Sequence, residues 1–158
     1  MTTAREHVGA GLLARVVLGI DGTEPSIAAA RAVAPLVGAA GGEVIAVFVR
    51  HLPVLAEPSA GEAIAIVEET IDEMAEQARR DAEELFRGSG VSYEFVVREG
   101  DPGLGILAVA HEREATMVAI GATIHGPVAA LLVASVADHL VHHCDLPLLI
   151  IRPDRAPA

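Results

Sequence analysis

The sequence contains no lysine, and its eleven basic residues are all arginine. This absence excludes chemistry that depends on a lysine, such as a Walker nucleotide-binding loop, a Schiff base or the lysine of a phosphorelay receiver. The net charge is −11, so the chain offers no basic stripe to nucleic acid or to an anionic membrane. Aromatic residues make up only 3% of the chain, which leaves out stacking platforms for single strands.

Cysteine and long apolar runs are also scarce. Cys144 is the one cysteine, so no intrachain disulfide forms, as is typical of a reducing compartment. The N-terminal residues include Glu6 and lack a long apolar run, which does not match a signal peptide. No stretch reaches the ~18 apolar residues that span a bilayer. We therefore expect a cytoplasmic protein that does not enter membranes.

What the sequence does have is enough length and enough aliphatic residues for one domain. The chain has 158 residues, and 52% of them are hydrophobic. A domain of this size buries roughly 70% of the surface that its unfolded chain exposes. We predict an N-terminal extension over residues 1–14, one domain over 15–153 and a short tail over 154–158.

Short apolar runs alternate with segments of helical periodicity along the whole domain. Strands are predicted at 15–21, 43–50, 91–99, 116–121 and 147–153, and helices at 24–40, 61–87, 102–113 and 128–143. This alternation favours an α/β fold, with a parallel sheet and helices on both faces. Ligands of such sheets bind beyond the carboxyl ends of the strands, where the strand order reverses.

Several helix ends carry local signals. Thr23 is predicted to cap the first helix, and the Gly41-Gly42 pair is predicted to end it. Pro35 lies inside the same helix and is expected to kink or shorten it. Asp101 precedes a proline after the third strand, and we expect its carboxylate to cap the next helix.

Asp21 is the first candidate functional residue. It follows the first strand, where its carboxylate could meet a ribose hydroxyl or a metal ion. Asp and Gly are also favoured in turns for their own sake, and Gly22 comes next. The residues alone leave both interpretations open.

The segment over residues 121–137 is the second candidate site. Small residues before a helix suit an anion, because the free backbone N–H groups and the helix dipole point toward it. Gly121 allows a close approach, and Thr123 and Ser135 offer hydroxyls. No arginine lies between Arg113 and Arg152, so a phosphate would depend on Mg²⁺ held by the aspartate after the first strand. On the residues alone, phosphate binding is not favoured.

A third candidate is the run DHLVHHCD near the end of the last predicted helix. His139 and His143 are four residues apart and share a helix face, with Cys144 and Asp145 close by. Zinc is conceivable for such a set. Histidines near a helix C-terminus are also favoured by the dipole and the free carbonyls, and we prefer this interpretation to a metal site.

Three stretches of the chain occur in the order found in one known family. They are VVLGIDGTEPS, then VVREGDPGLGIL, then VAIGATIHG followed by ASVADHLVHHCDLPLLIIR. On these stretches, residues 15–152 resemble the universal stress protein family. The resemblance implies a five-stranded parallel sheet of order 3-2-1-4-5, Rossmann-like and similar to the adenine nucleotide α-hydrolases. It also implies a homodimer through the last strand, Leu146 to Ile151, whose apolar edge should be covered or paired.

The ATP-binding branch of that family carries the motif G-x-x-G-x9-G-[S/T]. Gly121 matches its first glycine, and Ser135 matches its hydroxyl residue. Ile124 and Ala134 stand where the second and third glycines would be, and Ala137 stands where a further hydroxyl is often found. If position 124 requires a left-handed backbone, a non-glycine residue there costs about 1–2 kcal/mol, and a β-branched one costs more.

The resemblance also implies roles for the adenosine half of a ligand. It places Asp21 at the ribose, Val49 at the adenine and Ile120 near the base. Gly126 could restore the turn if the loop shifts its register by two residues. The candidate ligand-binding residues are therefore Ile20, Asp21, Val49, Ile120, Gly121, Thr123, Gly126, Ser135 and Val136.

Three functions stay open at this point. The first is a dimeric stress-response module that acts through protein contacts, with weak or absent ATP binding. The second is a sensor that binds ATP, AMP or cyclic AMP at the switch point between the first and fourth strands. The third, slow ATP hydrolysis, is the least favoured, because no general base or cationic clamp stands beside the loop.

Overall fold

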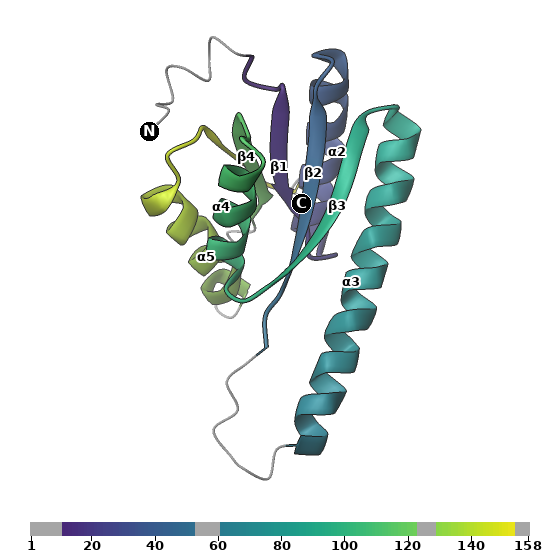
Figure 1. The fold of residues 1–158 in the computed structure, drawn as a ribbon, viewed down its shortest axis with the longest axis vertical. Coiled ribbons are helices and arrows are strands. Elements are labelled where there is room, and N and C mark those ends of the chain that lie inside the picture. Colours follow the sequence, from purple (N-terminus) through teal and green to yellow (C-terminus); the bar gives the residue numbers. More distant parts are fainter. Residues whose placement is uncertain (1–10, 53–60, 123–128, 154–158) are drawn as a thin grey trace, which may run out of the picture.

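The computed structural model describes residues 11–52, 61–122 and 129–153, with the backbone alone over 129–135. The strands are β1 (Arg15–Gly19), β2 (Glu43–Arg50), β3 (Ser92–Glu99), β4 (Met117–Gly121) and β5 (Leu148–Ile151). The helices are α2 (Glu24–Ala39), α3 (Gly61–Ser89), α4 (Pro102–Glu112) and α5 (Ala129–His143), and Figure 1 shows their arrangement. Strands and helices alternate as the sequence predicts.

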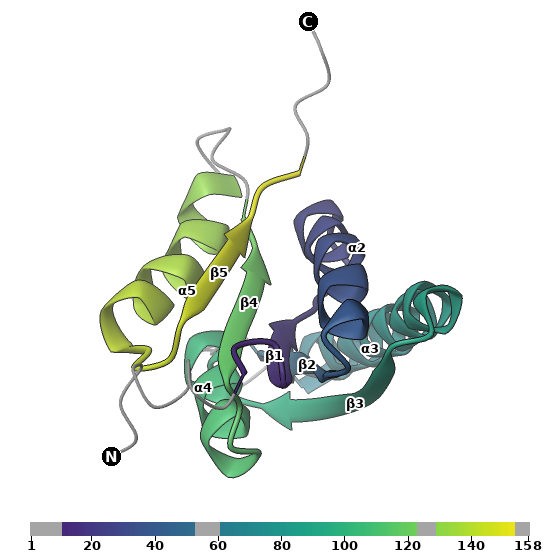
Figure 2. The same ribbon diagram turned by 90° about the horizontal axis from the view of Figure 1, so that it is seen from above.

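The strands form one parallel sheet in the order β3-β2-β1-β4-β5, which confirms the predicted fold class. The view from above shows α2 and α3 on one face of the sheet and α4 and α5 on the other (Figure 2). The order reverses between β1 and β4, because the chain moves outward to β3 and then returns to add β4 and β5. The switch point therefore lies at the carboxyl ends of β1 and β4.

Two hydrophobic cores lie on the two faces of the sheet, because successive side chains of a strand point to opposite sides. Val16 and Leu18 of β1 pack in one core with Phe86 of α3. Val17, between them in sequence, packs in the other core with Leu140 of α5. All five of these side chains are 0% exposed, so the centre of the sheet is covered on both faces.

The end of α2 agrees with one prediction and corrects another. Gly41 adopts a positive φ of 71°, and the N–H of Gly42 donates to the carbonyl of Val37 at 2.9 Å, which together form a Schellman ending. Pro35 does not shorten the helix, which continues to Ala39. Pro35 lies on the exposed side of α2, so the carbonyl that loses its partner faces water, and the cost of the proline is small.

Other predicted boundaries shift by a few residues. β1 ends at Gly19 and β5 begins at Leu148, so both strands are shorter than the apolar runs that predict them. Thr23 occupies the predicted N-cap position of α2, but its side chain makes no capping hydrogen bond. Asp101 does cap α4, since its carboxylate accepts from the N–H of Leu104 at 3.0 Å.

Candidate functional site

The switch point of the sheet lies where β1 and β4 end. The chain leaves β1 into α2 on one face and leaves β4 toward α5 on the other, so the two exits diverge. Ile20 and Asp21 follow β1, while Ile120 and Gly121 close β4. The structure therefore brings the predicted residues after these two strands to one edge of the sheet.

The Asp21 carboxylate takes part in the turn that starts α2. Its Oδ1 accepts hydrogen bonds from the N–H of Thr23 at 3.0 Å and from the Thr23 hydroxyl at 2.5 Å. Gly22, between them, has a φ of +81°, which a glycine adopts at low cost. The hydroxyl of Ser26 donates to the carbonyl of Thr23 at 3.0 Å and accepts from the N–H of Asp21 at 3.3 Å. The turn interpretation is thus correct. Both of these bonds to Thr23 use Oδ1, so a ribose contact would fall to Oδ2.

Gly121 is required by packing inside the protein. A Cβ at this position would lie 1.9 Å from the carbonyl oxygen of Pro25 and 2.8 Å from the nitrogen of Ser26. The first turn of α2 therefore rests directly on the end of β4, with no room for a side chain. This contact explains the glycine without any phosphate, so its match to the nucleotide motif is weaker evidence than the sequence alone indicates.

The apolar candidates divide between the two faces of the sheet. Val49, Ile120 and Val136 belong to the core beneath α4 and α5. Ile20 belongs to the opposite core and is 2% exposed. Val49 is half-buried against α4, where a Cβ on Gly105 would lie 2.9 Å from its Cγ2. Val49, Ile120 and Val136 therefore share one face of the sheet, and Ile20 lies on the other face.

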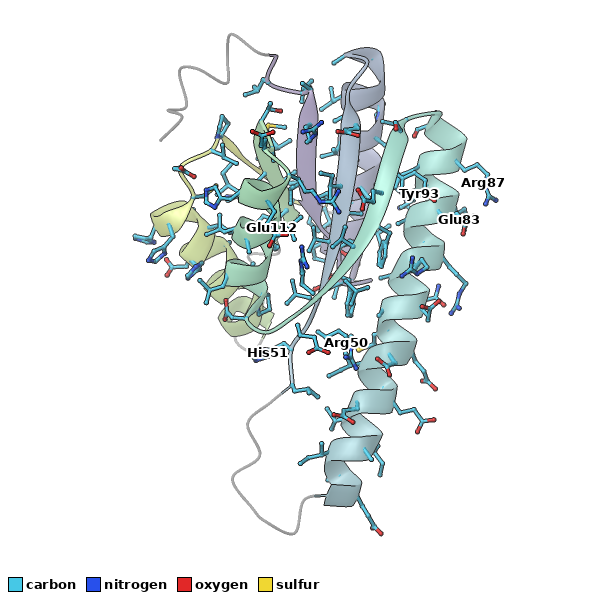
Figure 3. All side chains as sticks on the ribbon, in the orientation of Figure 1. Arg50, His51, Glu83, Arg87, Tyr93 and Glu112 are labelled. Carbon is cyan, nitrogen blue, oxygen red and sulfur yellow. The ribbon has the colours of Figure 1, made fainter. Side chains whose placement is uncertain are left out.

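Arg50 is a charged residue of this edge that the sequence reasoning missed. It ends β2, and its guanidinium binds Asp72 of α3 at 2.6 Å and Glu99 of β3 at 2.7 Å (Figure 3). Next to it, the His51 Nδ1 lies 3.1 Å from the carbonyl oxygen of Gly100. The sequence carries no motif that marks this arginine, because its partners Asp72 and Glu99 lie 22 and 49 residues away. The two carboxylates already neutralise its charge.

The phosphate half of the predicted site lies mostly outside the described residues. Thr123, Ile124 and Gly126 fall in the undescribed segment, and only the backbone is described at Ala134 and Ser135. Their predicted roles stay predictions. The hydroxyl lost at Ala137 leaves a half-buried methyl group packed in the core under α5.

The histidines near the end of α5 interact with one another. The rings of His139 and His143 stack with centroids 4.3 Å apart, and the His143 Nδ1 lies 2.9 Å from the His139 carbonyl oxygen. Burial raises the pKa of the Cys144 thiol, which disfavours the thiolate that zinc would require. No group of three or more metal-binding side chains occurs in the described parts of the chain. The arrangement matches the interpretation of histidines at a helix C-terminus.

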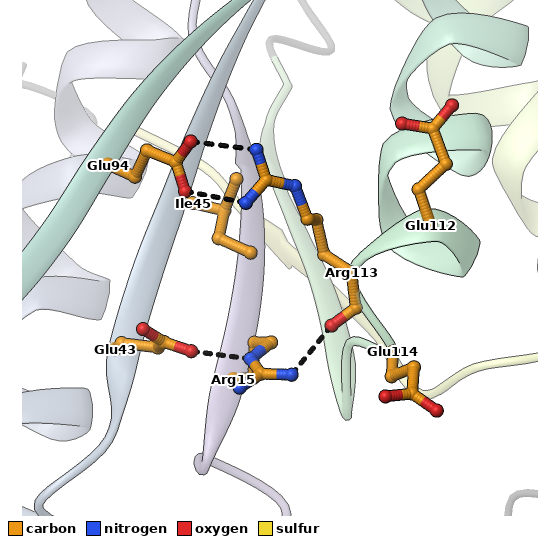
Figure 4. Close-up of a pocket in the computed structure, with 7 residues that line it drawn as sticks. All are labelled: Arg15, Glu43, Ile45, Glu94, Glu112, Arg113 and Glu114. Atoms are coloured by element: carbon orange, nitrogen blue, oxygen red, sulfur yellow. Dashed lines mark hydrogen bonds and ion pairs between the residues drawn. The ribbon is translucent and has the colours of Figure 1, made fainter.

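A charged cavity of about 350 Å³ lies at the opposite, amino-terminal edge of the sheet. Figure 4 shows the two terminal nitrogens of the Arg113 guanidinium bound to the two carboxylate oxygens of Glu94, at 2.8 and 2.7 Å. Arg15 binds Glu43 and donates to the Arg113 carbonyl oxygen at 2.8 Å. This cavity is remote from the switch point, and internal ion pairs occupy its arginines. We therefore do not assign it to the candidate site.

The parallel sheet, its order reversing between β1 and β4, defines an open α/β fold with a switch point at the strand ends. Residues 13–152 match the model of the universal stress protein family. The chain belongs to this family, as its sequence motifs predict.

Individual relatives agree with this assignment. The universal stress protein MJ0531 of Methanocaldococcus jannaschii is 23% identical over 144 residues, which cover 91% of this chain and 85% of the relative. A crystal structure of a family member from Burkholderia pseudomallei has a TM-score of 0.70 at 22% identity, covering 91% of this chain and 98% of that one.

Two further structures hold adenine nucleotides. A universal stress protein in complex with cAMP has a TM-score of 0.66 at 19% identity, with 89% of this chain and 97% of that chain covered. An Arabidopsis thaliana family protein with AMP bound has a TM-score of 0.61 at 14% identity, with 89% and 92% covered. At these identities the likeness shows a shared fold.

Over the described residues, none of the helices is both long enough and apolar enough to cross a membrane.

Proposed function

We propose that this chain is a stress-response regulatory module of the cytoplasm that acts through protein contacts and binds ATP weakly or not at all. The observation that supports this proposal is the negative charge at the carboxyl edge of the sheet. Asp21, Glu99 and Asp101 bring carboxylates there, and Arg50 is already held by two acidic side chains. A triphosphate at this edge meets more negative than free positive charge.

The magnitude of the repulsion favours the same conclusion. A carboxylate and a phosphate charge about 4 Å apart repel by about 1 kcal/mol in water and about 4 kcal/mol at a protein surface. A Mg²⁺ held by the Asp21 carboxylate would supply positive charge to the phosphates and would offset part of this repulsion. The replacement of two motif glycines by Ile124 and Ala134 adds to the cost.

The proposed module is a homodimer that pairs through its last strand. β5 has β4 on one side only in the strand order, and Ile150 is 38% exposed. An apolar edge strand of this kind is a template for pairing with another chain. Leu146 is only 8% exposed and packs in the core, so the contact would come from Leu148–Ile151.

An adenine-nucleotide sensor for ligands of lower charge is the alternative. The observation in its favour is the position of the residues that the family resemblance matches to the adenosine half of a ligand. Asp21 follows β1, and its turn bonds to Thr23 use only Oδ1, while Val49 and Ile120 share one apolar face. The cAMP and AMP seen in two structures of similar fold are ligands of this class.

Calorimetric titration of nucleotide-free protein with Mg²⁺-ATP, AMP and cAMP tests these proposals. We expect no heat of binding from ATP at micromolar concentration. Binding of AMP or cAMP alone would establish the sensor, and micromolar ATP binding would refute the proposed charge argument.

Light scattering on the same samples should give the mass of a dimer, and Ile150→Lys should give a monomer of unchanged fold. A wild-type monomer would refute the β5 contact.

A further inference from the structure

Strand β3 forms one edge of the sheet. It pairs with β2 alone among the described strands, and the register runs without a break from Ser92 to Glu99. Figure 2 shows β3 at the border of the molecule. An edge strand presents a row of backbone N–H and C=O groups that its own sheet leaves unpaired. The row on β3 spans eight residues, compared with four on β5 at the other edge.

The backbone groups of β3 alternate between β2 and the free edge. The N–H of Gly100, directly after the strand, donates to the carbonyl of Arg50 at the end of β2 at 3.0 Å. Because alternate residues of a strand direct their backbone groups to the same side, the even-numbered residues of β3 also face β2. The odd-numbered residues direct theirs to the free edge, and these are Tyr93, Phe95, Val97 and Glu99.

The side chains of β3 divide between the two faces of the sheet in the same alternation. Tyr93 and Phe95 pack against the core under α2 and α3. Val96 packs against the core on the opposite face, and Glu94 and Arg98 lie on that face at either side of it. This face of β3 therefore carries an acidic, an apolar and a basic side chain in that order.

This order is complementary to itself when a second β3 runs antiparallel. A twofold axis at Val96 brings Glu94 opposite Arg98 of the second copy, and the reverse pair forms on the other side of the axis. Opposite charges across a strand pair stabilise it. The same axis sets Phe95 opposite Val97 of the second copy, and both direct their backbone groups to the free edge. The hydrogen bonds and the charges are therefore satisfied in one register.

Neighbouring registers lose this match. An axis at Phe95 or at Val97 places neither charged residue opposite the other. An axis at Glu94 or at Arg98 brings two like charges face to face, which destabilises a strand pair. Charge therefore selects the register centred on Val96.

Both charged side chains remain accessible at this edge. Glu94 is 50% exposed and binds Arg113, while Arg98 is 39% exposed and binds Glu112. The bond to Glu112 uses Nη2 of Arg98, and its Nε has no hydrogen-bond partner in the described part of the chain. Each guanidinium has five N–H donors, so a second carboxylate can bind without displacing the first. Pairing would thus join the ion pairs of two copies into a network of alternating sign.

We propose that the free edge of β3 pairs antiparallel with β3 of a second copy, about an axis at Val96. This contact goes beyond the proposed dimer, because it uses the edge of the sheet opposite β5. Exposed ion pairs each contribute little, so we expect the contact to form at higher protein concentration than the β5 pairing. Pairing at both edges would link copies into a linear assembly.

Sedimentation velocity of the full chain carrying Ile150→Lys tests this contact by itself, because that variant removes the pairing at β5. A reversible dimer is expected as the concentration rises from about 10 µM to about 1 mM. A variant that stays a monomer over the whole range would refute the proposal.

Charge reversal in the same Ile150→Lys chain tests the register. Glu94→Arg alone and Arg98→Glu alone each place like charges across the axis, and each should weaken association about tenfold. The double variant Glu94→Arg/Arg98→Glu restores opposite charges and should associate as the unreversed chain does. It also loses the bonds to Arg113 and Glu112 within one chain, so an effect through the fold alone would make it the weakest of the three. That result would overturn the proposal.

A matched control comes from an exposed ion pair on α3. Glu83 and Arg87 have the same charges and the same spacing as the β3 pair. Glu83→Arg and Arg87→Glu should leave the association unchanged, and circular dichroism checks that each variant is folded. Equal weakening by these control variants would show an effect of net charge, and association that the β3 variants retain would place the contact elsewhere. Either result would contradict pairing through β3.

The outcomes for β3 and for the proposed function can be told apart. A wild-type chain that is a monomer at micromolar concentration refutes the β5 contact, and the charge-reversal series still reports on β3. A wild-type dimer whose mass does not rise further with concentration keeps the β5 contact and refutes pairing through β3. Micromolar ATP binding bears on the proposed function alone.

Discussion

The two edges of the sheet are held in different ways. Among the described residues, the buried polar side chains are Thr116 at the amino-terminal edge and Ser26 at the carboxyl edge. The Thr116 hydroxyl accepts from the N–H of Arg15 at 3.0 Å and lies 2.9 Å from the Leu12 carbonyl oxygen. These bonds join parts of the chain 101 and 104 residues apart. The bonds of Ser26 span three and five residues.

The amino-terminal edge therefore depends on contacts between distant parts of the chain, whereas the carboxyl edge depends on contacts within single turns. The amino-terminal edge is held by long-range bonds, so a change there disturbs the pairing of β1 and β4. The carboxyl edge is built from local turns, such as the one around Gly22, which set their own geometry. Local turns of this kind can change residue by residue while the sheet stays intact.

The largest expected effects come from one glycine at each edge. A Cβ on Gly42 would lie 1.9 Å from the Leu13 carbonyl oxygen, as close as the contact between Gly121 and Pro25. Gly42→Ala and Gly121→Ala should each lower the free energy of unfolding by about 3 kcal/mol, because the obstacle is backbone. Urea denaturation measures this loss. Gly61→Ala, with nothing within 4 Å of its Cβ, is the control and should be nearly neutral.

The buried hydroxyls should give the next largest difference. Thr116→Val should cost about 2 kcal/mol, because it leaves the N–H of Arg15 buried without its partner. Ser26→Ala should cost about 1 kcal/mol, since the turn at Asp21 keeps its other hydrogen bonds. Urea denaturation measures the two losses in the free energy of unfolding, which are compared through the denaturation midpoints of the variants where their m-values are equal. Equal losses would contradict the distinction between a long-range and a local edge.

Substitutions of Asp21 should distinguish its role in the turn from a role in ligand binding. Loss of the two bonds to Thr23 should cost about 1 kcal/mol of stability, as for a lost helix cap. Asp21→Asn keeps an acceptor for the turn but removes the charge. If an adenine ligand binds, both variants should weaken it, and calorimetry measures the affinity. A ligand that binds both variants as tightly as the wild type would remove Asp21 from the site.

The smallest effect concerns Cys144. Burial, the largest cause, raises the pKa of its thiol; a backbone hydrogen bond from Leu146 lowers it, and the charge of Asp145 adds a smaller rise. A raised folded pKa favours the native state while the thiol stays protonated, and this contribution is lost as pH rises through that pKa. The stability difference between the wild type and Cys144→Ala should therefore shrink above the ordinary thiol range. Urea denaturation at neutral and alkaline pH measures it, and a constant difference would contradict the burial argument.

The sequence predicted the elements well because their signals are local. The Gly41-Gly42 pair ends α2 through its own backbone angles, and Asp101 caps α4 three residues away. The family motifs predicted the strand order as well. Pro35 is the exception among these local signals, because its cost depends on which side of the helix meets water.

The candidate site was predicted less completely. Asp21 and Gly121 stand at the switch point as expected, yet both have structural partners that no motif reveals. Arg50 was missed, since an arginine that ends a strand has no recognisable pattern in the sequence. Ile20 was placed with the ligand residues, but strand alternation turns it into the opposite core.

By itself, the sequence determined the alternation of strands and helices, the helix ends and the acidic character of the chain. These depend on residue periodicity, on backbone angles and on composition, none of which requires a distant partner. Only the tertiary structure decided that Arg50 is neutralised by Asp72 and Glu99, that Pro25 fills the space beside Gly121, and that the N-terminal end of α3 extends past the strand ends. Those facts arise where segments far apart in the chain come into contact, and packing sets their geometry.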